Sequence, residues 1–372
     1  MEGLAIVDLL PLEIGARLRF SSPPRSVQGW LLHYFRRTCA TTKSSRGFDE
    51  ERHVPGARGA ADGFPDRYLT SQHPAKYISR HFSRNQRRRA QGPRTAFSFD
   101  GGIVVRNYLT SEELAQIEQE IRPHLDANTE LVDEFLPKET RRVTGLAEKS
   151  RLYLERICHH PLFSGVCDKL LTSTYQYWMG DSLKTSVSRP QLHATTVFSI
   201  GPGARPQDLH RDDINHHTYR PAVTVAEYVP GRETAIGCFV AGKKTSRANG
   251  ATRFIPGSHL QSSLTPPVEA DAVYAEMEPG EAFFMFASCY HGGSANTTED
   301  EERLVYGTFV TKGYLRQEEN QYLVLPLETV RQHPEELQQF LGYGMSSPFL
   351  GWIDLKSPLK VLFGNENASD QF

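Results

Sequence analysis

The sequence has 372 residues, of which 38% are hydrophobic, 23% charged and 10% aromatic. These values are typical of an ordinary folded protein and exclude collagen-like, coiled-coil and fully disordered chains. The length leaves room for one large domain or two ordinary ones. Because no apolar run approaches the ~18 residues that a bilayer-spanning helix needs, we expect no membrane span.

The net charge of -2 conceals two unlike parts. Residues 1–95 hold 17 Lys and Arg against 8 Asp and Glu, whereas the remainder holds 25 against 36. The first part lacks sustained apolar periodicity and contains the run Arg87–Arg89, so it buries too little apolar surface to offset the entropy of ordering. We predict a basic, disordered or loosely packed extension over residues 1–95, and expect no nucleic-acid partner.

Five cysteines are spread along the chain without a CxxC spacing. An odd number without paired spacing favours reduced thiols over a disulfide framework, which predicts a cytoplasmic location. The Arg and Ser content of the extension leaves an N-terminal targeting role open. Glu2, Asp8 and Glu13 argue against one, because transit peptides are poor in acidic residues.

The pattern of a folded domain begins near Phe97. Thr110 and Glu113 form a capping box before apolar residues at helical spacing, and this helix is expected to stop at Pro123. Two more helices are predicted over residues 149–159 and 161–175.

Short β-branched or aromatic runs separated by Gly and Pro follow these helices. The predicted strands are residues 195–200, 222–229, 235–240, 282–287 and 304–311. Strands of this length and spacing predict a β sandwich or barrel, with the helices packed on its outside. A last helix is predicted over residues 334–341, with Gly342 just beyond its end.

Candidate metal ligands lie where predicted strands meet loops. In a strand, residues two apart point to the same side, so His210 and Asp212 would face one ion, while Asp213 would face away. A closed β structure could bring in His291 as a third ligand. Two histidines and one carboxylate form the facial triad of non-haem iron(II) oxygenases. Structural zinc would instead need four ligands, usually including cysteines.

Arg303 begins the predicted strand that follows the His291 loop. Its planar guanidinium suits a bidentate grip on a carboxylate. A 2-oxoglutarate co-substrate needs such a grip at one end while its other end chelates iron. The alternative is a surface arginine in the charged stretch 299–303.

Four ordered motifs resemble the phytanoyl-CoA dioxygenase family, in particular fungal members that tailor alkaloids, meroterpenoids and polyketides. The motifs are residues 207–213, 249–259 and 291–296 with Arg303, and the stretch 313–321 adds to the resemblance. It implies a mainly β fold with flanking helices and a double-stranded β-helix (jelly-roll, cupin-like) core. The dioxygenase domain would cover residues 96–345, followed by a C-terminal tail over residues 346–372.

The resemblance also implies two sets of site residues. The implied iron ligands, which are also the catalytic residues, are His210, Asp212 and His291. The implied co-substrate contacts are Gln207, Thr252, Arg303 and Arg142. The cofactor would be Fe²⁺, with 2-oxoglutarate and O₂ as co-substrates.

The expected activity is an Fe(II)- and 2-oxoglutarate-dependent oxidation of an unactivated C–H bond in a small hydrophobic metabolite of fungal secondary metabolism. Hydroxylation, desaturation, rearrangement and endoperoxide formation all stay open. One alternative is an acyl-CoA 2-hydroxylase of the phytanoyl-CoA type, although the acidic body favours a neutral small molecule over CoA. Another is a non-catalytic metal-binding β-barrel protein. The resemblance implies a homodimer.

Three further histidines lie near these motifs. His259 is expected to shape a turn rather than bind metal. His216 and His217 would either line the mouth of the substrate site or lie in a solvated loop.

Overall fold

The computed structural model describes residues 6–8, 93–127 and 139–370. They belong to one compact unit formed by Met1–Leu10 and Arg84–Phe372. A second unit, Pro11–Ser83, lies outside the described residues. The Arg87–Arg89 run and most of the predicted N-terminal extension also lie outside them.

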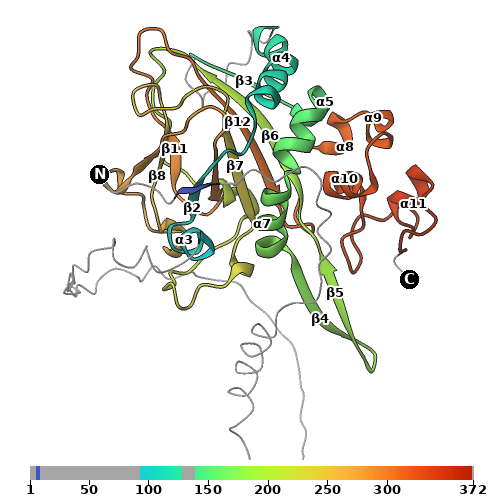
Figure 1. Ribbon diagram of the computed structural model, residues 1–372. Helices are drawn as coiled ribbons and strands as arrows, with labels where there is room; N and C mark the ends of the chain where they lie inside the picture. Colours follow the sequence, from blue (N-terminus) through green and yellow to red (C-terminus); the bar gives the residue numbers. More distant parts are fainter. Residues whose placement is uncertain (1–5, 9–92, 128–138, 371–372) are drawn as a thin grey trace, which may run out of the picture. The chain divides into compact units, whose positions relative to one another are not determined.

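The described unit is built on a seven-stranded sheet (Figure 1). In order of pairing, the strands are β1 (Ile6–Asp8), β2 (Gly102–Arg106), β10 (Ala282–Phe286), β7 (Ala235–Ala241), β12 (Arg303–Thr311), β6 (Gln191–Ile200) and β3 (Thr140–Thr144). All neighbours are antiparallel except β1 and β2. Strands β10, β7 and β12 are buried along almost their whole length. Their near-continuous apolar sequences fit strands that are covered on both faces.

A second, three-stranded sheet covers one face of the first. Its strands, in order, are β11 (His291–Gly293), β8 (Thr252–Phe254) and β9 (Val273–Ala275), all antiparallel. The rings of His291 and Phe239 lie 6.2 Å apart across the two sheets. This mostly antiparallel arrangement with flanking helices confirms the predicted fold class, a jelly-roll core of cupin type.

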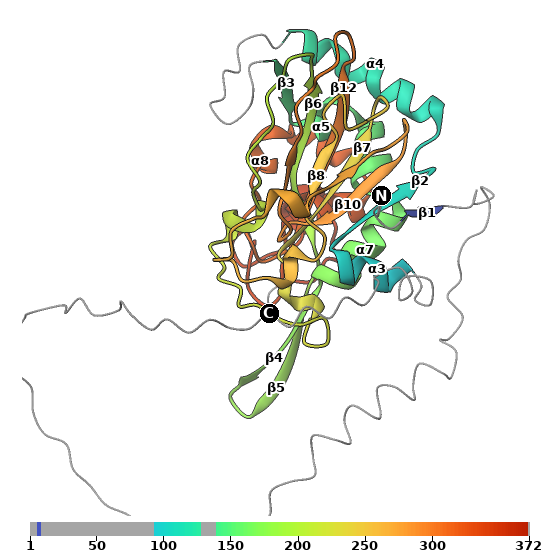
Figure 2. The same ribbon diagram turned by 90° about the vertical axis from the view of Figure 1, so that its left-hand side faces the viewer.

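Helices pack beside the large sheet, and a second group of helices comes after β12 in the chain (Figures 1 and 2). Those before residue 173 are α3 (Pro93–Asp100), α4 (Ser111–Ala127), α5 (Leu146–Lys149), α6 (Arg151–Tyr153), the π-helix η1 (Leu154–Cys158) and α7 (Pro161–Leu171). Those after β12 are α8 (Gln321–Val324), α9 (Leu327–Arg331), α10 (Glu335–Gln338), the π-helix η6 (Gln339–Tyr343) and α11 (Pro358–Phe363). The Tyr153 hydroxyl donates to the backbone oxygen of Gly307 at 2.7 Å, which fixes α6 against β12. No helix in the described ranges is long and apolar enough to cross a membrane.

Short 3-10 helices lie in the connections. They are η2 (Asp212–His216), η3 (Pro230–Arg232), η4 (Ser258–Leu260) and η5 (Glu269–Asp271). The four cysteines among the described residues are buried free thiols, as predicted.

The strands β4 (Ser173–Met179) and β5 (Ser182–Ser188) form a separate hairpin that projects from the body (Figure 2). The sequence did not predict it, and the helix expected over residues 161–175 ends at Leu171 instead. Tyr175, Tyr177 and Trp178 belong to β4. Aromatic side chains favour the extended backbone, which explains the early end of the helix.

Four of the five predicted strands are confirmed, as parts of β6, β7, β10 and β12. The strand predicted over residues 222–229 is wrong. There, Thr224 donates from its backbone and its hydroxyl to the Glu227 carboxylate, both at 2.8 Å, and Glu227 N–H bonds back to the Thr224 oxygen. Such local side-chain bonds compete with a sheet ladder and close a turn instead.

The predicted capping box is confirmed, because Thr110 and Glu113 exchange side-chain-to-backbone bonds of 3.0 and 3.2 Å. The predicted stop at Pro123 is wrong, since α4 continues to Ala127. Leu125 is buried on the same face as the apolar residues that precede the proline. Packing of that face outweighs the one backbone hydrogen bond that proline removes. At the last predicted helix, Gly342 has a left-handed, non-helical backbone (φ 104°) that breaks the helical run after Leu341, in keeping with the prediction that the helix ends before Gly342.

Two findings bear on the predicted domain limits, which stay a prediction. Strand β1, inside residues 1–95, pairs with β2. Helix α11, inside residues 346–372, buries Leu359 in the main core, and Lys360 pairs with Asp370 at 2.6 Å. Short pieces of both predicted flanks thus pack on the central domain.

Candidate active site

All seven predicted site residues line one cavity of about 490 Å³ between the two sheets. They are Arg142, Gln207, His210, Asp212, Thr252, His291 and Arg303. Strands β3, β6, β7 and β12 form one wall, and β8 and β11 form the opposite wall. Residues far apart in the sequence therefore meet in one place.

His210, Asp212 and His291 present ligand atoms that lie within 4.8 Å of one another. The Asp212 carboxylate lies 3.7 Å from His210 Nε2 through Oδ1 and 3.5 Å from His291 Nε2 through Oδ2. The two imidazole rings are 4.5 Å apart. These positions suit a single ion shared by two histidines and one carboxylate.

The backbone places the three side chains in a way that differs from the sequence prediction. Residues 210–212 do not form a strand: His210 makes an isolated bridge with His291, in which each backbone N–H donates to the other's oxygen at 2.9 Å. Asp212 begins η2. The bridge sets the two histidines side by side, and the helical turn then directs Asp212 toward both.

Hydrogen bonds orient both imidazoles. His210 Nδ1 lies 2.8 Å from the backbone oxygen of Asp208, and His291 Nδ1 lies 3.2 Å from that of Cys289. A carbonyl can only accept, so each Nδ1 carries the proton and each Nε2 lone pair faces Asp212. Burial lowers the pKa of His291, which favours its neutral form. Both rings are thus held as neutral Nε2 donors, the form in which histidine binds metal.

The Asp212 carboxylate fits a cation. Its Oδ2 is buried and has no hydrogen-bond donor among the described residues. A buried carboxylate oxygen without a donor is costly, and two imidazole lone pairs beside it supply none. A divalent cation bound by all three side chains would satisfy these atoms, so the donor set fits iron(II).

Asp213 has a different environment, in keeping with its rejection as a ligand. Its Oδ2 accepts from Arg220 Nε at 2.6 Å, and both side chains are buried. Arg220 also donates to the Thr234 hydroxyl at 3.2 Å and to the backbone oxygen of Arg232. This buried pair fixes the first turn of η2 and therefore supports Asp212.

Arg303 is buried in the same cavity, as the first residue of β12. It donates from Nη2 to the Thr252 hydroxyl at 2.8 Å, while its Nε has no acceptor among the described residues. Burial lowers the pKa of Arg303 to about 10. A buried guanidinium that still has an N–H group without an acceptor suits the binding of a carboxylate.

Gln207 lies close to both the triad and Arg303. Its Oε1 accepts from the backbone N–H of Gly293 at 2.8 Å, which leaves its amide nitrogen available to the cavity. Arg142 lies on β3 and pairs with Phe198 of β6. Arg303 pairs with Ile200, which is two residues from Phe198 on the same strand. Gln207 and Arg142 line the cavity together with the triad and Arg303.

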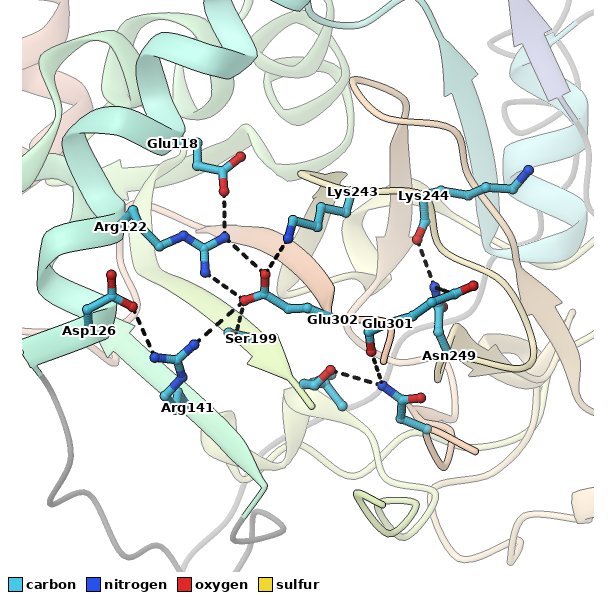
Figure 3. A network of polar contacts seen from close by, with 12 residues as sticks. Glu118, Arg122, Asp126, Arg141, Ser199, Lys243, Lys244, Asn249, Glu301 and Glu302 are labelled. Carbon is cyan, nitrogen blue, oxygen red and sulfur yellow. Dashed lines mark hydrogen bonds and ion pairs between the residues drawn. The ribbon is translucent and has the colours of Figure 1, made fainter. Parts of the chain in front are cut away.

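The carboxylate of Glu302, directly before Arg303, gathers donors from several elements (Figure 3). It accepts from Arg122 of α4 at 2.6 and 3.1 Å, from Lys243 at 2.7 Å, and from the Ser199 hydroxyl of β6. Partial burial alone would raise its pKa, but these hydrogen bonds lower the pKa of Glu302 to about 2. The network holds the start of β12 against α4 and β6, and so holds the backbone that carries Arg303.

Replacing Glu302 by Gln should lower the free energy of unfolding at pH 7 by about 1.5–3 kcal/mol, the usual worth of hydrogen bonds to a charged group. Because folding lowers the Glu302 pKa from 4.5 to about 2, the stability it contributes is complete above pH 4.5 and is lost as the pH falls toward 2. Urea unfolding between pH 7 and pH 3.5 should show a constant difference between wild type and Glu302→Gln down to about pH 4.5 and a narrowing difference below it. Glu155→Gln, which removes an exposed ion pair with Arg151, should change stability by less than about 1 kcal/mol.

Several cavity residues escaped the sequence analysis. Among them are Arg205, Ile214, Asn215, Glu318 and Glu319. Ile214 and Asn215 line the cavity instead of the suggested His216, whose Nε2 lies 3.4 Å from the Thr311 hydroxyl. The stretch 313–321 contributes to the family resemblance, but no local pattern marks Glu318 and Glu319 as cavity residues. Its position relative to the site depends on the loop after β12, which no local pattern specifies.

His259 is structural, as expected. Its ring is buried, Nε2 bonds to the backbone oxygen of Ser98 at 3.0 Å, and Phe286 lies 5.3 Å away.

Comparison with known proteins identifies the family. Residues 97–305 match the family model described as phytanoyl-CoA dioxygenase (PhyH). The chain is 42% identical over 270 residues to the dioxygenase himG of Aspergillus japonicus, which covers 70% of this chain and 83% of that protein. It is 43% identical over 265 residues to the dioxygenase peniF of Penicillium patulum, covering 71% of this chain and 86% of that protein. Among solved structures, it aligns with the epimerase SnoN in complex with Fe³⁺, alpha ketoglutarate and nogalamycin RO, at 21% identity and a TM-score of 0.42, over 58% of this chain and 81% of that one. The chain belongs to the phytanoyl-CoA dioxygenase family and is an oxygenase enzyme of that family.

Proposed function

We propose that the protein is an Fe(II)- and 2-oxoglutarate-dependent dioxygenase that oxidises an unactivated C–H bond of a small hydrophobic metabolite. One observation carries the proposal: the ligand atoms of His210, Asp212 and His291 converge in the same cavity as the buried, incompletely bonded Arg303. The cavity thus offers a triad for iron and, apart from it, a cation for the far carboxylate of the co-substrate. Dioxygenase relatives in Aspergillus and Penicillium support a role in fungal secondary metabolism.

Each residue of the site has a defined task in this proposal. His210 and His291 bind iron through Nε2 while their Nδ1 protons stay on backbone oxygens, and Asp212 supplies the anionic ligand. Arg303 and the Thr252 hydroxyl receive the far carboxylate of 2-oxoglutarate. The bound iron would supply the activation of O₂, and the protein supplies orientation.

The apolar wall completes the arrangement. The side chains of Phe198, Phe239, Val305 and Phe309 line the cavity. They hold a hydrophobic substrate in a fixed position beside the triad and keep water from the reacting carbon. The position of the substrate carbon relative to iron would decide between hydroxylation, desaturation and rearrangement. Cytoplasmic location and the homodimer stay predictions.

Succinate release tests the proposal. In air, with iron(II) and 2-oxoglutarate, wild type should release succinate slowly even without its substrate, and chelation of iron should stop it. His210→Ala should release none above the buffer rate, because a ligand is missing. Equal succinate release by wild type and His210→Ala would contradict the proposal.

A further inference from the structure

Two neighbouring glutamates line the cavity in the loop after β12, and they differ in how their carboxylates are used. Glu319 accepts from the backbone N–H of Gly145 at 2.5 Å, and from the backbone and hydroxyl of Thr195 at 3.1 and 2.9 Å. These bonds join the loop to Gly145, directly after β3, and to Thr195 of β6. Glu318 lines the same cavity, and its side chain is 55% exposed.

The His193 side chain holds Glu318 in place through two contacts. Its backbone N–H donates to His193 Nδ1 at 3.1 Å, so the neutral ring carries its proton on Nε2. That Nε2 lies 3.5 Å from Glu318 Oε2. Burial lowers the pKa of His193 to about 4, so the ring is uncharged near neutral pH and does not neutralise the carboxylate. The carboxylate is therefore oriented by a ring that does not neutralise it.

Strand register places Glu318 away from the co-substrate anchor. Arg303 pairs with Ile200 on β6, whereas Glu319 N–H bonds to the backbone oxygen of His193 on the same strand. Ile200 and His193 are roughly 23 Å apart along β6 at ~3.3 Å per residue. A molecule that spans only from the triad to Arg303 does not reach this end of the cavity, so it is left for the substrate.

The surroundings of Glu318 combine an apolar surface with carboxylates, since Asp212 and Glu319 line the same cavity. Ala194, Phe309 and Ile214 line the cavity together with Glu318. Partial burial, followed by the charge of Asp212, raises the Glu318 pKa, while the Asn215 side chain lowers it. Arg142 has the smallest of these effects on the carboxylate. A cation on an apolar skeleton complements this end of the cavity best.

We infer that Glu318 is a specificity-determining residue that receives a protonated amine on a substrate whose remaining skeleton is apolar. The inference rests on the proposed function, because it takes the space beside the triad as the substrate chamber. Binding of the amine at Glu318 would fix the distance between that amine and the carbon presented to the triad. The substrate class is thus an amine-bearing hydrophobic metabolite rather than an acid.

A matched pair of probes tests this inference on the full chain. Calorimetric titration with 2-(naphthalen-2-yl)ethylamine and with 2-(naphthalen-2-yl)ethanol compares a cation and a neutral group on one skeleton. Wild type should bind the amine about 10-fold more tightly, equivalent to ~1.4 kcal/mol. Glu318→Gln should reduce this preference to less than about 2-fold, and Glu112→Gln, at an exposed residue of α4, should preserve it.

Equal binding of the two probes by wild type would overturn the inference. So would the absence of amine binding, or a preference that survives in Glu318→Gln. The titration is done once without metal and once with iron(II) and 2-oxoglutarate under anaerobic conditions. Failure to bind iron and 2-oxoglutarate would refute the proposed function, whereas the amine preference of the metal-free protein reports on Glu318 separately.

Discussion

Asp212→Ala should abolish iron(II) binding and slow 2-oxoglutarate consumption by at least about 100-fold. Even a residue that only orients a metal ligand typically contributes about 10- to 100-fold, and Asp212 is the carboxylate between two imidazoles that lie 3.5 and 3.7 Å from it. Without it, two neutral histidines would have to hold the cation alone. Iron content after anaerobic desalting and the rate of succinate release would measure the two effects.

Asp208→Asn provides the matched control for this prediction. Asp208 is exposed, and its backbone oxygen, which bonds to His210 Nδ1, is unchanged by the substitution. This variant should retain the iron affinity and turnover of wild type. Normal iron binding by folded Asp212→Ala would refute the assignment of the triad.

Arg303→Leu should separate the two binding events. Iron(II) should still bind, because the triad is intact, whereas 2-oxoglutarate should bind more weakly by about 2–5 kcal/mol, the usual cost of truncating one partner of a buried charge pair. This corresponds to a loss of affinity of roughly 30-fold or more. Arg303→Lys keeps the charge but loses the planar fork, and should fall between wild type and Arg303→Leu.

The control for Arg303 is Arg331→Leu, which removes a half-exposed arginine on α9. It should leave the dissociation constant for 2-oxoglutarate unchanged. If Arg303→Leu loses iron as well as 2-oxoglutarate, the site has collapsed and the anchor role is not supported. If it loses neither, the far carboxylate is bound elsewhere.

The central strands could be predicted because they are covered on both sides. β7, β10 and β12 are short, largely apolar segments, and their composition therefore indicates burial. The β4–β5 hairpin could not be predicted in this way. Its two faces are largely exposed, so no alternation of polar and apolar residues marks it.

Helix limits depended on packing that a local pattern does not contain. Pro123 is a helix breaker in isolation, yet Ile121 and Leu125 lie buried on either side of it. Residues 222–229 form a turn instead of a strand because the Thr224 hydroxyl bonds to the Glu227 carboxylate. Tertiary contacts decided the first case, and a side-chain hydrogen bond decided the second.

The site residues could be selected from the motifs, but their geometry could not. The prediction put His210 and Asp212 on one strand, whereas a single bridge to His291 and the start of a 3-10 helix bring them together. Residues such as Glu318 carry no motif. They reach the cavity through the loop after β12. Bonds from Glu319 to Gly145, directly after β3, and to Thr195 of β6 fix the path of that loop.

Anaerobic titration of the iron(II)-loaded chain with 2-oxoglutarate tests the central claim most directly. If the triad holds iron and Arg303 holds the far carboxylate, a weak visible charge-transfer band should appear and saturate with one 2-oxoglutarate per chain. Succinate, which lacks the 2-oxo group, should produce no band. A folded wild-type chain that shows no band at saturating iron(II) and 2-oxoglutarate would contradict the account.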